Sequence, residues 1–361
     1  MPLYSIIIPT YNNIEFTLKC VSSIFKNTSL FQIEIIIIDN ASTDRTLSWA
    51  QQLHKQGIIR LVSNPDNMGF SHACNQGALI AKGQSLIFLN NDTEVLPGWL
   101  QGMQNCFKSD QNIGIIGGKL LYPDNTIQHA GIAFDRQKVF HIYRHFHPAH
   151  PAVNKRREFQ AVTGACLFVR RDLFITLGMF DEEFKNGFED LDFCFRVRKN
   201  GLKVFYSPEC SVIHHESKTP GRHAHHHQNA KLFTDRWQQD IVHDLDIIHA
   251  QDGLRQLQPE KSNLLGKWFH DKNPNPFVSK ARFFRDSGRF CEAEEAFNLA
   301  LRFNPFDLRR LDIAEELGDF YLKIKNPAAA QSCFEAIAAI FPSAQISKKI
   351  KRAEQAKLLA L

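Results

Sequence analysis

The first 90 residues alternate between short β-branched runs and segments with helical periodicity, and this alternation restricts the fold more than any other feature of the chain. We expect strands at residues 5–9, 34–38, 58–62 and 85–89, separated by helices at residues 14–25, 46–56 and 72–81. The second run is nearly all isoleucine, which is typical of a strand buried on both faces of a parallel sheet. The pattern predicts a doubly wound, mostly parallel α/β sheet.

Beyond residue 95 the alternation is less regular. We expect helices at residues 99–107, 171–177, 188–200 and 230–241, and strands at residues 113–117, 165–170, 204–206 and 212–213. The last two are expected as separate short strands. A first domain would therefore span residues 1–245.

The C-terminal third has a different organisation. Residues 246–276 are polar and end in Asn-Pro-Asn-Pro, which is typical of a linker. Residues 277–361 show helical patterns only, and two of their segments align at an offset of 37 residues. The aligned pairs are Phe283 with Phe320, Ala293 with Ala330, Phe297 with Phe334, and Pro305 with Pro342. These helix pairs resemble tetratricopeptide repeats. Two such units are too few to stand alone, so we expect them to pack against the first domain, a protein partner or a second copy of the chain.

Composition excludes several classes of protein. The 43 basic and 38 acidic residues leave a net charge of +5 with no long basic run, so we expect no nucleic-acid partner. No apolar run approaches the roughly 18 residues of a membrane span. The opening residues lack the features of a signal peptide, and the eight cysteines form no CxxC pair. We therefore expect a cytoplasmic protein with reduced thiols.

Polar residues follow three of the expected strands. Thr10 and Tyr11 follow the first, Asp39 and Asp44 the second, and the triplet at residues 90–92 the fourth. Each of these alone is typical of a helix cap or turn. In an open α/β sheet, however, ligands bind at the carboxyl ends of the strands, so the series predicts a binding site.

Several phosphate-binding and catalytic motifs are absent. The sequence has no GxGxxG after the first strand, no GxxxxGK[ST], no GxSxG and no HExxH. A site for a phosphorylated ligand without a glycine-rich loop needs another source of positive charge. A divalent metal held by carboxylates would supply it.

Eight motifs carry a family resemblance. They lie at residues 5–12, 38–44, 67–77, 88–94, 162–165, 178–184, 187–192 and 212–215. In this order they resemble family 2 glycosyltransferases of the GT-A fold over about residues 3–240, most strongly the bacterial rhamnosyltransferase-like branch. The resemblance implies a nucleoside-diphospho-sugar transferase fold. Residues 1–95 would then form the nucleotide-binding half and residues 96–245 the acceptor half.

The resemblance also implies a donor site and a metal site. The expected nucleotide-sugar-binding residues are Pro9, Thr10, Tyr11, Asp39, Asn67, Asn91 and Asp92. Asp92 stands at the last position of the family's DxD motif and would hold a divalent metal. Asn90 replaces the first Asp of that motif, which puts a strict metal requirement in doubt. His214, or its neighbour His215, would be a second ligand, and an imidazole favours Mn²⁺ over Mg²⁺.

An acidic cluster at residues 189–192 is expected to contain the catalytic base. Displacement at an anomeric carbon inverts it and requires a base for the acceptor hydroxyl. By resemblance Asp190 is that base, and Glu189 orients the acceptor. The alternative is an acidic helix start that complements the helix dipole. For Arg196 and Arg198, a salt-bridge role and a diphosphate contact both stay open.

Histidines are frequent in two segments. His223, His225, His226 and His227 are expected in a solvated loop, with a pyrophosphate or metal contact as the alternative. A second group lies in the irregular segment where this family builds its acceptor side, and comprises His129, His141, His145, His147 and His150.

Taken together, the motifs predict an inverting glycosyltransferase that moves a sugar from a UDP- or dTDP-sugar to a hydroxyl of a growing glycan, assisted by Mn²⁺ or Mg²⁺. A lipid-linked glycan acceptor would bring the enzyme to the inner face of the membrane. The alternative is a decayed glycosyltransferase-like scaffold that binds partners through its helical repeats. A nucleotidyltransferase is disfavoured, because it would need a glycine-rich basic loop after the first strand.

Overall fold

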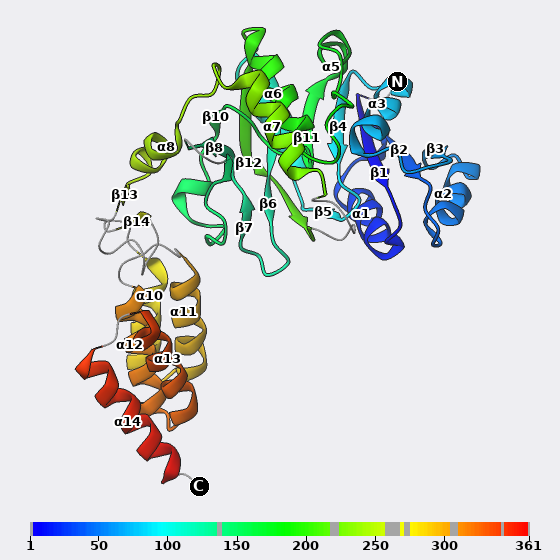
Figure 1. Ribbon diagram of the computed structural model, residues 1–361. Helices are drawn as coiled ribbons and strands as arrows, with labels where there is room; N and C mark the ends of the chain where they lie inside the picture. The colour runs from blue at the N-terminus through cyan, green and yellow to red at the C-terminus, as the bar shows by residue number, and fades with distance from the viewer. Residues whose placement is uncertain are drawn as a thin grey trace. The chain divides into compact units, whose positions relative to one another are not determined.

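The computed structural model describes residues 3–135, 139–216, 224–256, 268–270, 275–303, 310–340 and 343–359. The chain forms two compact units, the first comprising Met1–Arg144 with Pro151–Leu245 and the second His145–His150 with Asp246–Leu361. Figure 1 shows the α/β sheet of the first unit and the helices of the second. No helix in the described ranges is long and apolar enough to cross a membrane.

The predicted α/β fold is confirmed, and its sheet, expected to be mostly parallel, is mixed in direction. The main path of the sheet has the order β10-β12-β6-β11-β4-β1-β2-β3. Its first four strands are β1 (Tyr4–Thr10), β2 (Ile33–Asn40), β3 (Arg60–Asn64) and β4 (Ser85–Leu89). They pair in parallel, with β1 between β2 and β4. β3 begins two residues later than expected.

Alternate residues of β1 enter different hydrophobic cores, because successive side chains of a strand point to opposite faces. Ile7 belongs to a core that includes Cys74. Ile6 and Ile8 belong to another that includes Val21. The helices of this half are α1 (Ile14–Asn27), α2 (Thr46–Lys55), α3 (Phe70–Ile80) and α4 (Trp99–Ser109). The isoleucine-rich strands thus fit a sheet buried on both faces.

The second half of the sheet is mixed in direction. β11 (Cys166–Arg170) runs antiparallel to both β4 and β6 (Ile113–Leu121). The two short strands expected at residues 204–206 and 212–213 are one strand, β12 (Lys203–His214), so that expectation is wrong. Its pairing with β6 is irregular between Ser207 and Ser211. Pro208, which has no N–H to donate, lies within the irregularity and explains why the sequence reads as two pieces.

Shorter elements complete the first unit. They are β5 (Thr93–Val95), β7 (Ile127–His129), β8 (Ile132–Phe134), β9 (Val139–His141), β10 (Arg157–Phe159), α5 (Arg171–Thr176), α6 (Glu189–Lys199) and α7 (His226–Trp237). Helix α7 begins four residues earlier than expected. His226 and His227 therefore lie in its first turn rather than in a loop, and His223 lies outside the described residues.

The second unit is mostly helical. Residues 246–276, expected as a linker, include most of α8 (Leu245–Gln251) and a pair of short antiparallel strands, β13 (Leu254–Gln256) and β14 (Trp268–His270). The described residues that follow form the helices α10 (Pro276–Asp286), α11 (Phe290–Phe303), α12 (Arg310–Lys323), α13 (Pro327–Ile340) and α14 (Ala344–Leu358). His147 also belongs to this unit, and its backbone N–H donates to the Phe303 carbonyl at 3.2 Å.

The internal alignment at an offset of 37 holds in part at the level of burial. Ala293 and Ala330 are fully buried, as are Phe297 and Phe334. Phe283, however, is 63% exposed, whereas its aligned partner Phe320 is 2% exposed. The prolines of the fourth aligned pair lie outside the described residues. Of the three aligned pairs that the structure describes, two therefore agree in burial and one does not.

Candidate active site

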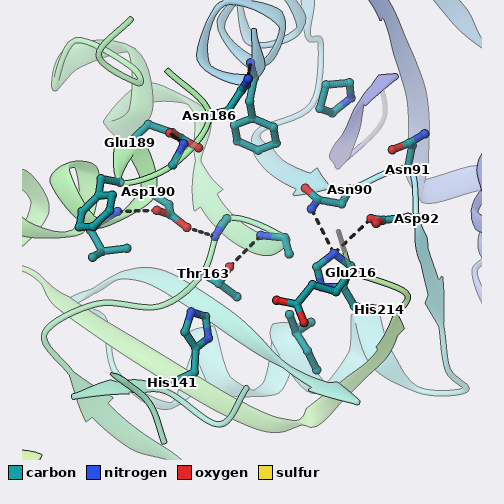
Figure 2. A pocket seen from close by; sticks show the side chains of 18 of the residues that line it. Asn90, Asn91, Asp92, His141, Thr163, Asn186, Glu189, Asp190, His214 and Glu216 are labelled. Atoms are coloured by element: carbon teal, nitrogen blue, oxygen red, sulfur yellow. Dashed lines mark hydrogen bonds and ion pairs between the residues drawn. The ribbon is translucent and has the colours of Figure 1, made fainter. Parts of the chain in front are cut away.

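A cavity of about 370 Å³ lies at the carboxyl ends of β1 and β4 in the first unit. Its walls include these expected residues: Pro9, Thr10, Tyr11, Asn67, Asn91, Asp92, Glu189, Asp190 and His214. Figure 2 shows how the polar side chains gather around it. Both halves of the sheet contribute, so residues far apart in the sequence share one space.

Asp39 is the expected donor-site residue that does not line the cavity. Its side chain is fully buried. Its Oδ1 accepts a hydrogen bond from Thr10 Oγ1 at 3.4 Å, and its Oδ2 accepts from the Ser42 N–H at 3.0 Å. The carboxylate thus ties the end of β1 to the turn after β2 and supports Thr10, which does reach the cavity wall.

Strand pairing brings Asp92 and His214 together. β5 runs antiparallel to the end of β12, with Thr93 opposite His214. His214 Nε2 therefore lies 3.1 Å from Asp92 Oδ1, and both side chains are almost fully buried. The neighbouring His215 turns to a different partner, Glu94 Oε1, at 2.8 Å. Of the two histidines expected as ligands, His214 is the one whose imidazole lies beside the Asp92 carboxylate.

The two asparagines before Asp92 have different surroundings. Asn90 Nδ2 lies 3.3 Å from His214 Nε2, beside the contact between His214 and Asp92 (Figure 2). Asn91 Nδ2 donates to Thr17 Oγ1 at 3.0 Å, which ties the loop to α1. Asn90 thus belongs to the same small polar cluster as His214 and Asp92.

The donor set around His214 fits a divalent cation in its chemistry. One imidazole nitrogen and one carboxylate face each other at hydrogen-bonding distance. Groups of three or more potential metal-ligating side chains do not occur among the described residues. A cation held by two side chains would keep positions for phosphate oxygens and water, as Mg²⁺-type sites commonly do.

The start of α6 places Glu189 and Asp190 at the cavity. The three residues before it, Asn186, Gly187 and Phe188, all have positive φ, at 54°, 140° and 75°. For Asn and Phe this is a sparsely populated backbone region, and such strain is often found at functional sites. Glu189 Oε2 accepts the Gly187 N–H at 2.6 Å, which holds the tight turn.

The Asp190 carboxylate has a fixed orientation. Its Oδ2 accepts the Gly164 N–H at 2.6 Å and its Oδ1 accepts the Leu191 N–H at 2.9 Å (Figure 2). Gly164 lies close because it has no side chain, and a Cβ there would be 3.2 Å from the Asp190 Cβ. The backbone therefore holds this carboxylate on the cavity wall.

The rest of the acidic cluster is structural. Asp192 is fully buried and accepts hydrogen bonds from Arg196 at 2.8 Å, Arg236 at 2.8 Å and Trp237 at 2.9 Å. Of the two roles considered for Arg196, the structure therefore shows the salt bridge, which it forms with Asp192. The Arg198 guanidinium lies over the Phe195 ring, and neither Arg196 nor Arg198 lines the cavity.

The histidines of the irregular segment belong to two different units. His141 lines the cavity, and its Nδ1 lies 2.9 Å from Nδ1 of the buried His129. Burial, followed by the charges of His141 and His214, lowers the pKa of His129 well below its ordinary value. His145, His147 and His150 fall in the second unit.

Sequence reasoning did not single out several lining residues. They are Gln128, Arg144, Asn186, Phe188 and Glu216, together with others on the apolar wall. Glu216 stands two residues after His214, and that proximity was an available signal. Gln128 and Arg144 lie in segments without periodicity, where the sequence offers no such signal.

Part of the first unit is similar to known proteins. Residues 5–178 match the family model described as glycosyl transferase family 2. The O-antigen biosynthesis protein RfbC of Myxococcus xanthus is 31% identical over 226 residues, which are 60% of this chain and 17% of that protein. The N-acetylglucosaminyl-diphospho-decaprenol L-rhamnosyltransferase of Mycobacterium tuberculosis is 25% identical over 229 residues, 56% of this chain and 74% of that protein. The chain spans less than a third of the length of the curated relatives that share 31% identity with it.

A solved structure shares the fold. The crystal structure of GalNAc-T7 with UDP, GalNAc and Mn²⁺ superposes with a TM-score of 0.51 at 18% identity. The match covers 70% of this chain and 54% of that one. It supports the GT-A-like arrangement of the sheet described above.

Proposed function

We propose that this chain, whose residues 5–178 match the glycosyl transferase family 2 model, transfers a sugar from a nucleoside diphosphate sugar to a hydroxyl acceptor with inversion at the anomeric carbon. The observation that carries the proposal is one shared cavity. The Asp92–His214 pair and the Asp190 carboxylate all line it. An inverting transferase needs a site for the diphosphate and a base for the acceptor hydroxyl in the same cavity, and these residues would provide the two.

Asp190 is the proposed general base. The acceptor hydroxyl oxygen forms a bond to the anomeric carbon while the bond from that carbon to the diphosphate oxygen breaks. The hydroxyl proton passes to the Asp190 carboxylate, and the diphosphate leaves with the electron pair. The N–H groups of Gly164 and Leu191 hold the carboxylate in place for this transfer. A positioned base contributes roughly 10²–10⁴-fold to such a step. Glu189 is proposed to orient the acceptor.

The charge of the cavity favours metal assistance. Among the described lining residues, Asp92, Glu189, Asp190 and Glu216 are acidic, and Arg144 is the one arginine or lysine. Without added positive charge, this wall would repel a diphosphate. We propose that Asp92 and His214 hold Mn²⁺ or Mg²⁺. A divalent cation bound there would neutralise charge on the departing diphosphate.

The donor and acceptor are proposed by chemical class. Pro9, Thr10, Tyr11, Asn67 and Asn91 would contact a UDP- or dTDP-sugar, with Asp39 acting through Thr10. The acceptor would be a glycan or a lipid-linked glycan at the inner face of a membrane. The relatives named for O-antigen biosynthesis and for rhamnosyl transfer support this acceptor class.

The domain roles belong to the same proposal. The donor half would be residues 1–95 and the acceptor half residues 96–245, with residues 246–276 as connection. The helices of residues 277–361 are proposed to act as tetratricopeptide-like repeats that bind a protein partner or a second copy. The buried pairs Ala293 with Ala330 and Phe297 with Phe334 support a repeated packing unit.

A thermal-shift panel tests the proposal. UDP, dTDP, GDP and CMP are each added with and without Mn²⁺, because a ligand that binds only the folded state raises its stability. A shift with one nucleotide that grows with Mn²⁺, followed by transfer from the matching sugar donor, is the expected result. A chain that responds to none of them is better explained as a scaffold that binds through its helices.

A further inference from the structure

We infer that Gln128 is a positioning residue that fixes the tautomer of His214, so that the His214 Nε2 lone pair faces Asp92 and the two side chains can bind a cation together. The inference rests on the proposed function, because it concerns the cation that accompanies the nucleotide. Gln128 lies in β7, lines the cavity and is 4% exposed.

The orientation of the Gln128 amide follows from its acceptors. Its Nε2 donates to the backbone carbonyl of His214 at 3.2 Å and to Glu216 Oε2 at 3.3 Å. Both partners are oxygens that can only accept. An amide rotated by 180° would place Oε1 against these two oxygens, so the observed orientation is the one that satisfies the network.

This orientation determines which nitrogen of His214 carries the proton. Gln128 Oε1 lies 2.6 Å from His214 Nδ1. A carbonyl oxygen cannot donate, so Nδ1 must be the N–H group. A neutral imidazole carries only one N–H, and its Nε2 therefore presents a lone pair. Asn90 Nδ2, at 3.3 Å, can donate to that lone pair, which agrees with the assignment.

The assigned tautomer suits cation binding. His214 Nε2 lies 3.1 Å from Asp92 Oδ1, which is also an acceptor, so in the assigned neutral tautomer two electron-pair donors face each other with no proton between them. A divalent cation needs such a pair, whereas the opposite tautomer would place an N–H in the same space and leave no nitrogen lone pair for the metal. Buried partners of metal-binding histidines commonly act in this way. Glu216 affects His214 through Gln128, whose amide it helps to orient, and it also contacts Arg144 at 3.5 Å.

The matched pair Gln128→Met and Gln160→Met tests the inference. Gln160 is also 4% exposed and also has three hydrogen bonds, to the Val242 carbonyl, the Val242 N–H and Asp244, but it does not line the cavity. We expect both variants to lower the melting temperature. Only Gln128→Met should weaken Mn²⁺ binding in the presence of UDP, by about 10–100-fold. Titration calorimetry measures this without turnover.

Nitrogen-15 NMR of the metal-free protein gives a second readout. At a pH where the His214 ring carries one proton, we expect that proton on Nδ1 in the wild-type protein. The Gln128→Glu/Glu216→Gln double variant exchanges donor and acceptor between these two residues and keeps an acceptor for Nδ1–H, while it loses the bond to the His214 carbonyl. It should therefore retain the tautomer that Gln128→Met loses.

Two results would overturn the inference. One is a wild-type ring protonated on Nε2, and the other is Mn²⁺ affinity that does not change in Gln128→Met. Either can occur in an active transferase, so the proposed function would stand. Conversely, a protein that shows the expected tautomer and metal affinities but transfers no sugar refutes the proposed function and leaves the role of Gln128 intact.

Discussion

The Gly164 N–H donates to Asp190 Oδ2 at 2.6 Å, which joins the segment before β11 to the first turn of α6 across 26 residues of sequence. Gly164 also lies against Asp190 itself, since an added Cβ would come within 3.2 Å of the Asp190 Cβ. The position of the proposed base is therefore set by a backbone group and by the absence of a side chain.

Replacing Gly164 by alanine should displace the Asp190 carboxylate. Gly164 does not have a positive φ, so alanine is compatible with the backbone and the effect should be local. We expect kcat to fall by about 10–100-fold, because small displacements of a catalytic group are costly. Nucleotide affinity should not change. A Gly164→Ala enzyme with the wild-type kcat would show that the position of Asp190 is not critical.

Asp190→Asn should remove the proton acceptor while preserving size. Transfer should fall by at least the roughly 10²–10⁴-fold contribution of a general base. Binding of the nucleotide, measured by calorimetry, should stay as in the wild-type protein, because Asp190 is not proposed to contact it. Full activity in this variant would exclude Asp190 as the base.

Asp92→Asn should weaken the binding of nucleotide in the presence of Mn²⁺ but not in its absence. The amide keeps the size of the side chain but loses the charge that the proposed cation requires. Calorimetric titrations with UDP or dTDP, with Mn²⁺ or with EDTA, separate the two effects. Glu94→Gln serves as the control, since Glu94 pairs with His215 nearby and does not line the cavity. Equal metal dependence in wild type and Asp92→Asn would contradict the assignment.

Asp192→Asn should lower the free energy of unfolding by about 1–3 kcal/mol, because it weakens buried hydrogen bonds to charged groups. The buried carboxylate accepts bonds from Arg196, Arg236 and Trp237. Urea denaturation measures the change. Asp235→Asn is the matched control, since its pair with Lys231 is exposed and such pairs contribute little. Similar stabilities of the two variants would refute a structural role for Asp192.

Glu34 should make stability depend on pH in the acid range. Burial alone would raise the pKa of Glu34, but hydrogen bonds from Ser5, the Lys82 N–H and Arg60 outweigh it, so the pKa lies below 4.5. The stabilisation is therefore present above about pH 4.5 and is lost as the pH falls through the lowered pKa. Glu34→Gln should flatten that part of a stability profile measured by denaturation. A variant with the wild-type slope would show that Glu34 does not contribute.

Much of the fold followed from periodicity in the sequence. The four N-terminal strands and their helices were predictable because buried parallel strands read as continuous β-branched runs, and amphipathic helices repeat at helical spacing. The acceptor side was less predictable. The sequence predicts two short strands where the structure has the single strand β12, because Pro208 interrupts the β pattern. The predicted start of α7 is four residues too late, because His226 and His227 carry no helical signal of their own.

The site divides in the same way. Local sequence was enough to predict that acidic and polar residues at strand and helix ends, such as Asp92 and Asp190, belong to the site. The reason is that ligands of an open α/β sheet bind at the carboxyl ends of its strands. Tertiary structure alone decided their partners. Pairing of β5 with β12 sets His214 against Asp92, and Gln128 selects the His214 tautomer. These contacts join segments distant in sequence, and no local pattern encodes the distance between two side chains that only folding brings together.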